Sequence, residues 1–106
     1  MEPARIQLRR TKGWRMPENT VKVDRTTKWG NPFVIGRHGT QEECVARFEA
    51  MAIHGKVDAE GPIPEQRALL GLLREHINEL RGRNLACWCE PGTPCHADTL
   101  LKLANT

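Results

Sequence analysis

The sequence predicts a small α/β sandwich in which helices flank a short, at least partly parallel sheet. Three apolar stretches have the length and alternation of strands, at residues 4–10, 20–23 and 85–89. Two helical stretches lie between the second strand and the third. A connection of that length allows a crossover, so the third strand is able to pair in parallel with an earlier one. The whole chain, residues 1–106, is expected to form a single domain with one modest core.

The three predicted strands differ in character. In the first two, apolar residues alternate with polar ones, as expected of strands with one buried face. The third is an apolar run that ends in Cys87-Trp88-Cys89. Because neighbouring side chains of a strand point to opposite faces, Cys87 is expected to face the core and Trp88 the other side of the sheet.

Two helices between the strands have clear start and stop signals. Thr40 and Glu43 match a capping box, and Gly55 is a natural stop for the helix that begins there. Cys44 lies on the apolar face of this helix and is expected to be buried. The second helix is predicted over residues 65–81, where leucines recur at helical spacing.

A third, short amphipathic helix is predicted near the C-terminus. Thr93 has the chemistry of an N-cap, and Pro94 suits the first helical position. Cys95 and His96 are therefore expected in the first turn of this helix. The last quarter of the chain thus reads as strand, tight loop and helix, with cysteines at both ends of the loop.

Basic residues are concentrated in the N-terminal part of the chain. Residues 1–28 hold eight Lys and Arg against three Asp and Glu, whereas the net charge of the whole chain is only +3. This distribution indicates an anionic partner, either a small molecule or a nucleic acid, although a merely solvated basic face stays open. No segment is apolar enough for a membrane span or a signal peptide, so the cytoplasm, where thiols stay reduced, is the expected location.

Two stretches carry most of the candidate site residues, at 28–33 and 87–98. Each follows a predicted strand, and ligands of open α/β sheets bind at the carboxyl ends of strands. We therefore expect both stretches to line one pocket, with tryptophan faces on which a base can stack. The alternative for Trp29 and Phe33 is that they plug the edge of the core. The candidate ligand-binding residues are Arg10, Lys12, Trp14, Lys28, Trp29, Gly30 and Asn31.

The candidate catalytic residues are Cys89, Cys95, His96 and Asp98. A cysteine near a helix N-terminus is favoured as a thiolate, and a Cys–His pair supports covalent catalysis. The sequence therefore predicts a domain that binds a nucleotide-like or nucleic-acid-derived anion. Modification of a nucleotide or base is the activity that such a Cys/His pocket would suit.

Two other classes of function stay open. The basic N-terminal face could belong to a non-catalytic module that binds nucleic acid or another partner. Alternatively, Cys87, Cys89, Cys95 and His96 could hold a structural zinc ion. The spacing argues against zinc, because consecutive helical residues point about 100° apart and would have to converge on one ion with two strand residues. No metal ligand is assigned, and the sequence specifies neither a cofactor nor an oligomeric state.

Three motifs span nearly the whole chain: residues 9–17, the Lys-Trp-Gly-Asn-Pro-Phe stretch at 28–33, and Cys87-Trp88-Cys89 with Cys95-His96-Ala97-Asp98. Together they resemble a family of small bacterial and phage domains, the domain-of-unknown-function family 4326. The resemblance implies a stand-alone cytosolic α/β domain, often carried by phages, and it transfers no established activity. In the family pattern the segment between the two cysteine motifs is often one residue shorter than here, which bears on the shape of that loop.

Overall fold

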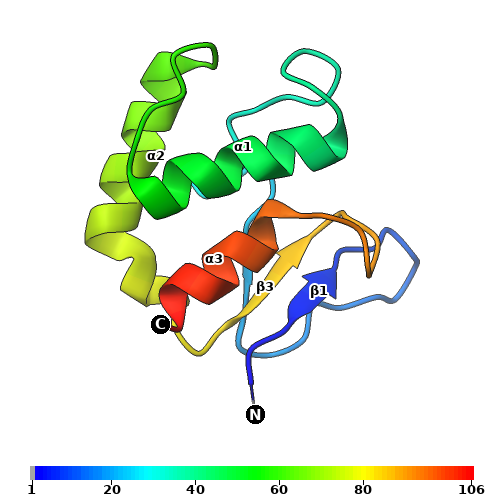
Figure 1. Cartoon of the computed structure of the whole chain (residues 1–106). Coiled ribbons are helices and arrows are strands. Elements are labelled where there is room, and N and C mark those ends of the chain that lie inside the picture. The colour runs from blue at the N-terminus through cyan, green and yellow to red at the C-terminus, as the bar shows by residue number, and fades with distance from the viewer. Residues whose placement is uncertain (1) are drawn as a thin grey trace.

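The protein contains a three-stranded parallel sheet, seen here in a computed structural model that describes residues 2–106. The strand order is β1-β3-β2, so the last strand of the sequence is the central one. The α/β fold with a parallel sheet predicted from the sequence is thus confirmed (Figure 1). The elements are β1 (Arg5–Gln7), β2 (Thr20–Lys22), α1 (Gln41–His54), α2 (Ile63–His76), the 3-10 helix η1 (Ile77–Leu80), β3 (Asn84–Cys87) and α3 (His96–Ala104).

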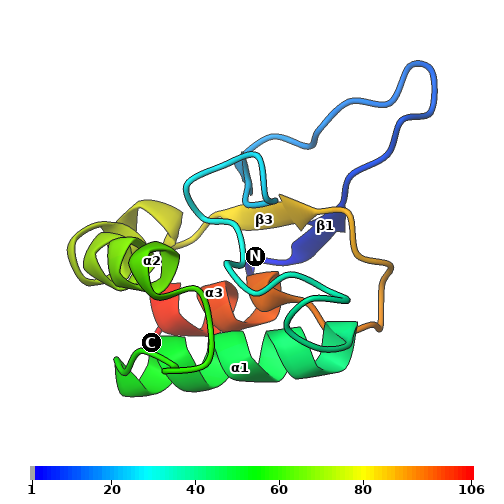
Figure 2. The ribbon, with the colours of Figure 1, turned by 90° about the horizontal axis from the view of Figure 1, so that it is seen from above.

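Helix α3 lies at the centre of the packed layers. It packs against β3 and β1 on one side, and α1 runs along its other side (Figures 1 and 2). Helix α2 contacts α1, and η1 contacts α3. Apolar side chains from the strand ends and the helices form one core, which includes Val23, Phe33, Phe48, Leu85 and Leu100. The core therefore joins the carboxyl ends of the strands to the start of α3.

Helix α1 begins and ends where its sequence signals predict. The Thr40 hydroxyl accepts a hydrogen bond from the Glu43 amide at 3.2 Å, while the Glu43 carboxylate accepts from the Thr40 amide at 3.0 Å. Gly55 adopts a left-handed conformation with φ of 66°, and its amide closes the last turn onto Met51. These contacts are local, so neighbouring residues alone specify both ends of the helix.

The structure corrects the boundaries of the other two helices. The segment predicted as one helix over 65–81 begins at Ile63 and tightens into η1 at Ile77. Helix α3 begins at His96 with Cys95 as its N-cap, whereas Thr93 was predicted to be the cap. The Thr93 amide and hydroxyl instead donate to the carbonyl of Glu90 and close a turn. Cys95 is extended, with φ of −152° and ψ of 140°, and so lies outside the helix.

The strands are shorter than predicted, and the chain leaves the sheet soon after β1. In Figure 2 the segment between β1 and β2 extends away from the body of the molecule. Residues 9–19 of this segment are exposed, except for the half-buried Trp14. We call residues 9–19 the basic loop, because they include Arg9, Arg10, Lys12 and Arg15. Within residues 2–106, no helix is both long enough and apolar enough to cross a membrane.

Candidate functional site

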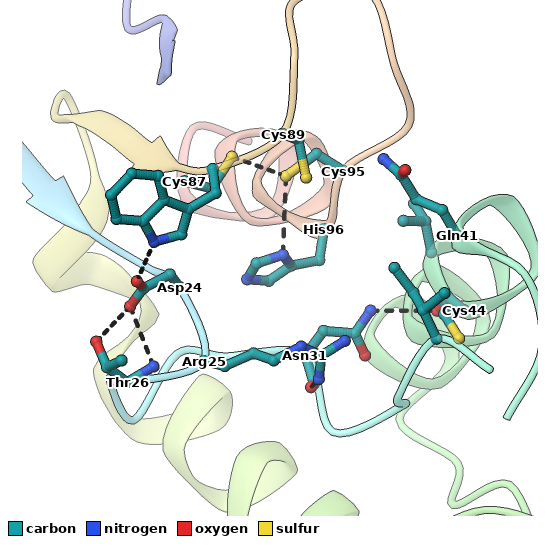
Figure 3. A pocket seen from close by; sticks show the side chains of 13 residues that line it. Asp24, Arg25, Thr26, Asn31, Gln41, Cys44, Cys87, Cys89, Cys95 and His96 are labelled. Atoms are coloured by element: carbon teal, nitrogen blue, oxygen red, sulfur yellow. Dashed lines mark hydrogen bonds between the residues drawn. The ribbon is translucent and has the colours of Figure 1, made fainter. Parts of the chain in front are cut away.

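A cavity of about 260 Å³ lies where β2 and β3 end. Asp24 and Arg25 follow β2, Trp88 follows β3, and the first turns of α1 and α3 complete the wall. In Figure 3 the sulfur atoms of Cys87, Cys89 and Cys95 lie on one side of the cavity and Asn31 lies on the opposite side. This is the position at which open α/β sheets bind ligands. The other lining residues are Thr26, Ile35, Gln41, Cys44, Val45, Cys87, Cys89, Cys95 and His96.

Three cysteine thiols gather in the wall of this cavity. The Sγ atoms of Cys87 and Cys95 are 2.9 Å apart, and those of Cys87, Cys89 and Cys95 all lie within 4.8 Å of one another. Cys87 ends β3 and Cys95 caps α3, so the packing of the helix against the strand brings them together. Both are buried, Cys89 is half-buried, and all three are free thiols. We call these residues the thiol cluster; such a group could hold a metal ion.

The three thiols differ in how readily they ionise. Hydrogen bonding to Cys87 and Cys95 lowers the pKa of Cys89, and the positive charge of Arg5 acts in the same direction. The same bonding raises the pKa of Cys87 and of Cys95, and burial adds to both increases. Cys89 is therefore the member of the cluster that is favoured as a thiolate. It is also the most exposed of the three.

His96 is buried beside the thiol cluster. Its Nε2 lies 2.7 Å from the carbonyl oxygen of Val23. Because a carbonyl only accepts, Nε2 carries the proton and Nδ1 keeps a free lone pair. Nδ1 lies 3.8 Å from the Sγ of Cys95, and the ring packs edge-on against Phe48 with 5.3 Å between centroids. Burial lowers the pKa of His96, which favours the neutral ring.

Arg5 of β1 holds the loop that joins Cys89 to Cys95. Its guanidinium donates to the carbonyl of Glu90 at 2.9 Å and to the carbonyl of Thr93 at 2.8 Å. It also contacts the Asp98 carboxylate at 2.9 Å, and the Arg5 side chain is only 12% exposed. One half-buried cation thereby fixes the shape of the loop and the position of the cysteine on each side of it.

Polar and aromatic side chains form the rim of the cavity. The Trp88 indole donates to the Asp24 carboxylate at 2.8 Å, and the Arg10 guanidinium lies 4.7 Å from the centre of the Trp88 ring. Arg25 donates to the carbonyls of Asn31 and Phe33, at 2.6 and 2.8 Å. Trp88 is 41% exposed and lines the cavity, so it stands at the cavity's mouth.

The structure brings together some of the predicted catalytic residues. Cys89, Cys95 and His96 line the cavity, as does Asn31 from the other predicted stretch. Asp98 does not: its side chain is 58% exposed and paired with Arg5, in a neighbouring cleft that it shares with Cys89. A role for Asp98 beside His96 therefore lacks support from the geometry.

The predicted ligand-binding residues are dispersed. Lys28 and Gly30 line a separate depression next to Asn31, and Lys12 and Trp14 belong to the basic loop. Trp29 is 3% exposed and belongs to the core, so its ring faces are covered and it offers no stacking surface in the cavity. The position of Trp29 agrees with the alternative interpretation, in which its side chain fills the edge of the core.

Several residues of the cavity were missed by the sequence analysis. Asp24 and Arg25 directly follow the second predicted strand, so the rule that ligands bind at strand ends could have identified them. Gln41 and Cys44 come from α1, and Gln41 bridges to the carbonyl of Pro94 at 2.6 Å. Their presence depends on how α1 packs along α3, for which the sequence holds no local signal.

Comparison with known proteins places the chain in one family. The family model described as domain of unknown function DUF4326 matches residues 6–106, which include every residue that lines the cavity. No curated protein and no solved structure matches the chain. The extent of the family match, over nearly the whole sequence, shows that the chain belongs to the DUF4326 family.

Proposed function

We propose that the domain binds a nucleotide-like anionic ligand in the cavity at the ends of β2 and β3, and that its Cys/His wall acts on the nucleotide or base bound there. The observation that carries the proposal is the stacked pair Arg10 and Trp88 at the mouth of the cavity. An exposed indole offers a face for a base, and a guanidinium binds phosphate oxygens in a forked geometry.

The size and lining of the cavity support a small ligand. Its volume of about 260 Å³ is below the roughly 300–1,000 Å³ of pockets for drug-sized molecules, which suits one base or one nucleotide. Opposite the thiol cluster, Asn31 donates one amide proton to the Cys44 carbonyl at 3.3 Å and keeps a second for a ligand. The half-buried Cys89 lies at the boundary between the cavity and solvent.

A panel of nucleoside phosphates and the matching nucleosides tests the proposal, with thermal stabilisation and calorimetric titration as readouts. We expect nucleoside phosphates to bind more tightly than nucleosides, and their affinity to fall as salt is added. Arg10→Ala should weaken binding, whereas Lys102→Ala, which removes an exposed cation on α3, should not. The absence of binding across the panel at millimolar ligand would contradict the proposal, as would equal losses in the two variants.

Catalysis is tested with whichever ligand binds. Incubation followed by mass spectrometry of the ligand should reveal conversion by the wild-type protein and its loss in Cys89→Ser, with the fold of the variant checked by circular dichroism. Because Cys89 is half-buried, serine fits without a cavity. If Cys89→Ser converts the ligand as fast as the wild-type protein does, the Cys89 thiol takes no part in the reaction.

The shape of the basic loop favours a second candidate function, the non-catalytic binding of nucleic acid. The loop extends from the body of the molecule and exposes four cations, which suits contact with a phosphate backbone (Figure 2). Fluorescence anisotropy with single-stranded oligonucleotides should then give a steep salt dependence, weakened by Arg9→Ala with Arg10→Ala. The matched control is Lys56→Ala with Lys102→Ala, two exposed cations outside the loop. Affinity that does not change with salt would argue against this function.

A further inference from the structure

We infer that Cys87, Cys89, Cys95 and His96 form a tetrahedral zinc site in the wall of the cavity. Thiolate sulfur and imidazole nitrogen are the ligands that zinc prefers in proteins, and a Cys3His set is a common structural combination. The inference does not depend on the proposed nucleotide ligand, because it concerns the binding of the metal alone. With zinc bound, all four side chains hold the metal, so a direct reaction of this wall with a ligand belongs to the metal-free protein. It rests on the thiol cluster and on the free lone pair of His96.

The separations of the sulfur atoms suit a metal after small adjustments. Zinc–sulfur bonds of about 2.3 Å in a tetrahedron place two sulfur atoms about 3.8 Å apart. The Sγ atoms of Cys87 and Cys95 are 2.9 Å apart, and no pair in the cluster exceeds 4.8 Å. Each pair is thus within about 1 Å of the separation required. Small rotations of these side chains supply that movement, with the proton of each S–H ligand released to solvent as the thiolate binds the metal.

His96 is the fourth ligand of the inferred site, although its ring nitrogens lie outside the group of three sulfur atoms and the ring must shift toward Cys87 and Cys89 when the metal binds. With bonds of about 2.0–2.1 Å to nitrogen and 2.3 Å to sulfur, the ligand atoms of a tetrahedral site lie about 3.6 Å apart. The Nδ1 of His96 lies 3.8 Å from the Sγ of Cys95, and Figure 3 draws this nitrogen facing the sulfur. Its Nε2 donates to the Val23 carbonyl, and metal-bound histidines almost always orient their second nitrogen in this way.

The backbone at Cys95 removes the objection raised by the spacing of the ligands. That objection assumed that Cys95 and His96 are consecutive residues of a helix and point about 100° apart. Cys95 is instead the extended N-cap, and only His96 has joined the helix. The change of backbone conformation between the two residues lets both side chains face the end of β3. Arg5, which lines a neighbouring cleft together with Cys89, is the cation that partly offsets the charge of three thiolates.

Metal titration of the reduced protein tests the inference. The protein is stripped with a chelator, kept reduced with a phosphine, and titrated with Zn²⁺ and Co²⁺ in competition with a coloured chelator. We expect one equivalent of either ion to bind, and Co²⁺ to show thiolate charge-transfer bands with the visible spectrum of a tetrahedral site. X-ray absorption of the zinc form should show three sulfur atoms at about 2.3 Å and one nitrogen at about 2.0–2.1 Å.

Cys44 provides a matched control for the cysteine variants. It is buried and lines the same cavity, but it does not belong to the thiol cluster. Removal of a group that hydrogen-bonds to a metal ligand weakens metal affinity about 10- to 100-fold. Cys89→Ser removes a ligand itself, so it should weaken zinc affinity by more than about 100-fold. Cys44→Ala should bind zinc as the wild type does. His96→Gln should keep the sulfur bands and change the visible cobalt spectrum.

Three outcomes would overturn the inference. The first is reduced wild-type protein that binds no stoichiometric zinc. The second is an X-ray absorption spectrum in which the zinc ligands are anything other than three sulfur atoms and one nitrogen. The third is a loss of affinity in Cys44→Ala as large as in Cys89→Ser. The absorption measurements use only wild-type protein, so they decide the matter even where a variant fails to fold.

Discussion

The guanidinium of Arg5 lies 2.9 Å from the carboxylate of Asp98, and this contact joins the first strand to the first turn of α3. The same guanidinium binds two carbonyls of the intervening loop, Glu90 and Thr93. Because Cys89 and Cys95 flank this loop, the geometry of the thiol cluster depends on a residue more than 80 positions away in the sequence.

Replacement of Arg5 by methionine should destabilise the protein. The variant Arg5→Met keeps most of the side-chain length and leaves two carbonyls and a carboxylate without their donor. Hydrogen bonds that involve a charged group contribute about 1.5–3 kcal/mol, so we expect the free energy of unfolding to fall by about 2 kcal/mol in urea titrations. Arg9→Met, in the exposed basic loop, should change it by less than about 0.5 kcal/mol. Equal effects would show that Arg5 is an ordinary surface cation.

Replacement by alanine should change the stability of the protein in opposite directions at Gly61, just before α2, and at Gly71, within it. A Cβ at Gly61 would lie 2.5 Å from Cε1 of Phe33 and 2.8 Å from Nε2 of Gln66, so Gly61→Ala should cost about 1–3 kcal/mol by overpacking. A Cβ at Gly71, inside the helix, meets nothing within 4 Å, and Gly71→Ala should gain about 0.5–1 kcal/mol from helix propensity. Thermal and urea unfolding of both variants check the signs. A Gly61→Ala protein as stable as the wild type would mean that Phe33 has room to move.

The ion pair of Arg47 and Asp58 should make stability depend on pH. The Arg47 Nε donates to the Asp58 carboxylate at 2.8 Å, and this hydrogen bond lowers the pKa of Asp58 below its usual 3.8. Because the folded pKa is the lower one, the stabilisation is present above the unfolded pKa and is lost as the pH falls toward the folded pKa. The pair is partly exposed, so its contribution should be no more than about 1 kcal/mol.

Urea titrations between pH 6 and about pH 2.5 measure this contribution. The wild-type protein should lose more stability over this range than Asp58→Asn does, since the asparagine does not titrate. Parallel curves for the two proteins would show that the ion pair contributes nothing to the pH dependence.

Metal should raise the stability of the folded protein. A ligand that binds only the native state at 100 times its Kd adds about 2.7 kcal/mol, so zinc should raise the melting temperature and a chelator should reverse the change. Magnesium at the same concentration should have no effect, because thiolates are poor ligands for it. A shift that persists in Cys89→Ser would have to come from zinc bound elsewhere.

The sequence was sufficient for α1 and insufficient for the start of α3. Thr40, Glu43 and Gly55 lie next to the helix ends that they specify, so tertiary contacts are not needed to place them. Thr93 has equally good capping chemistry, but its hydroxyl is used in a turn with Glu90. A distant arginine then holds that turn, and such a contact leaves no trace in the local pattern.

In the candidate site, too, some features could be predicted from the sequence, whereas others depend on tertiary contacts. The rule that ligands bind at the carboxyl ends of parallel strands correctly predicted that Asn31 and His96 line one cavity. This rule needs only the order of strands and helices. Residue type could not decide between Trp29 as a ligand contact and Trp29 as a core residue, since a large aromatic ring suits both places. The convergence of the thiols was missed because helical geometry was assumed for Cys95, one residue before the helix begins.

The central position of β3 has a consequence for the order of folding. Within residues 2–106, β1 and β2 pair only with β3, whose partner Leu85 lies 80 residues after Arg5 and 64 after Val21. Closing such long loops is entropically costly and makes sheet formation slow compared with that of a helical protein. On the ribosome, the first two strands must wait unpaired until residues 84–87 have emerged. The cavity walls that follow β2 and β3 are then completed in the same late event, so an incomplete chain has neither the sheet nor the site.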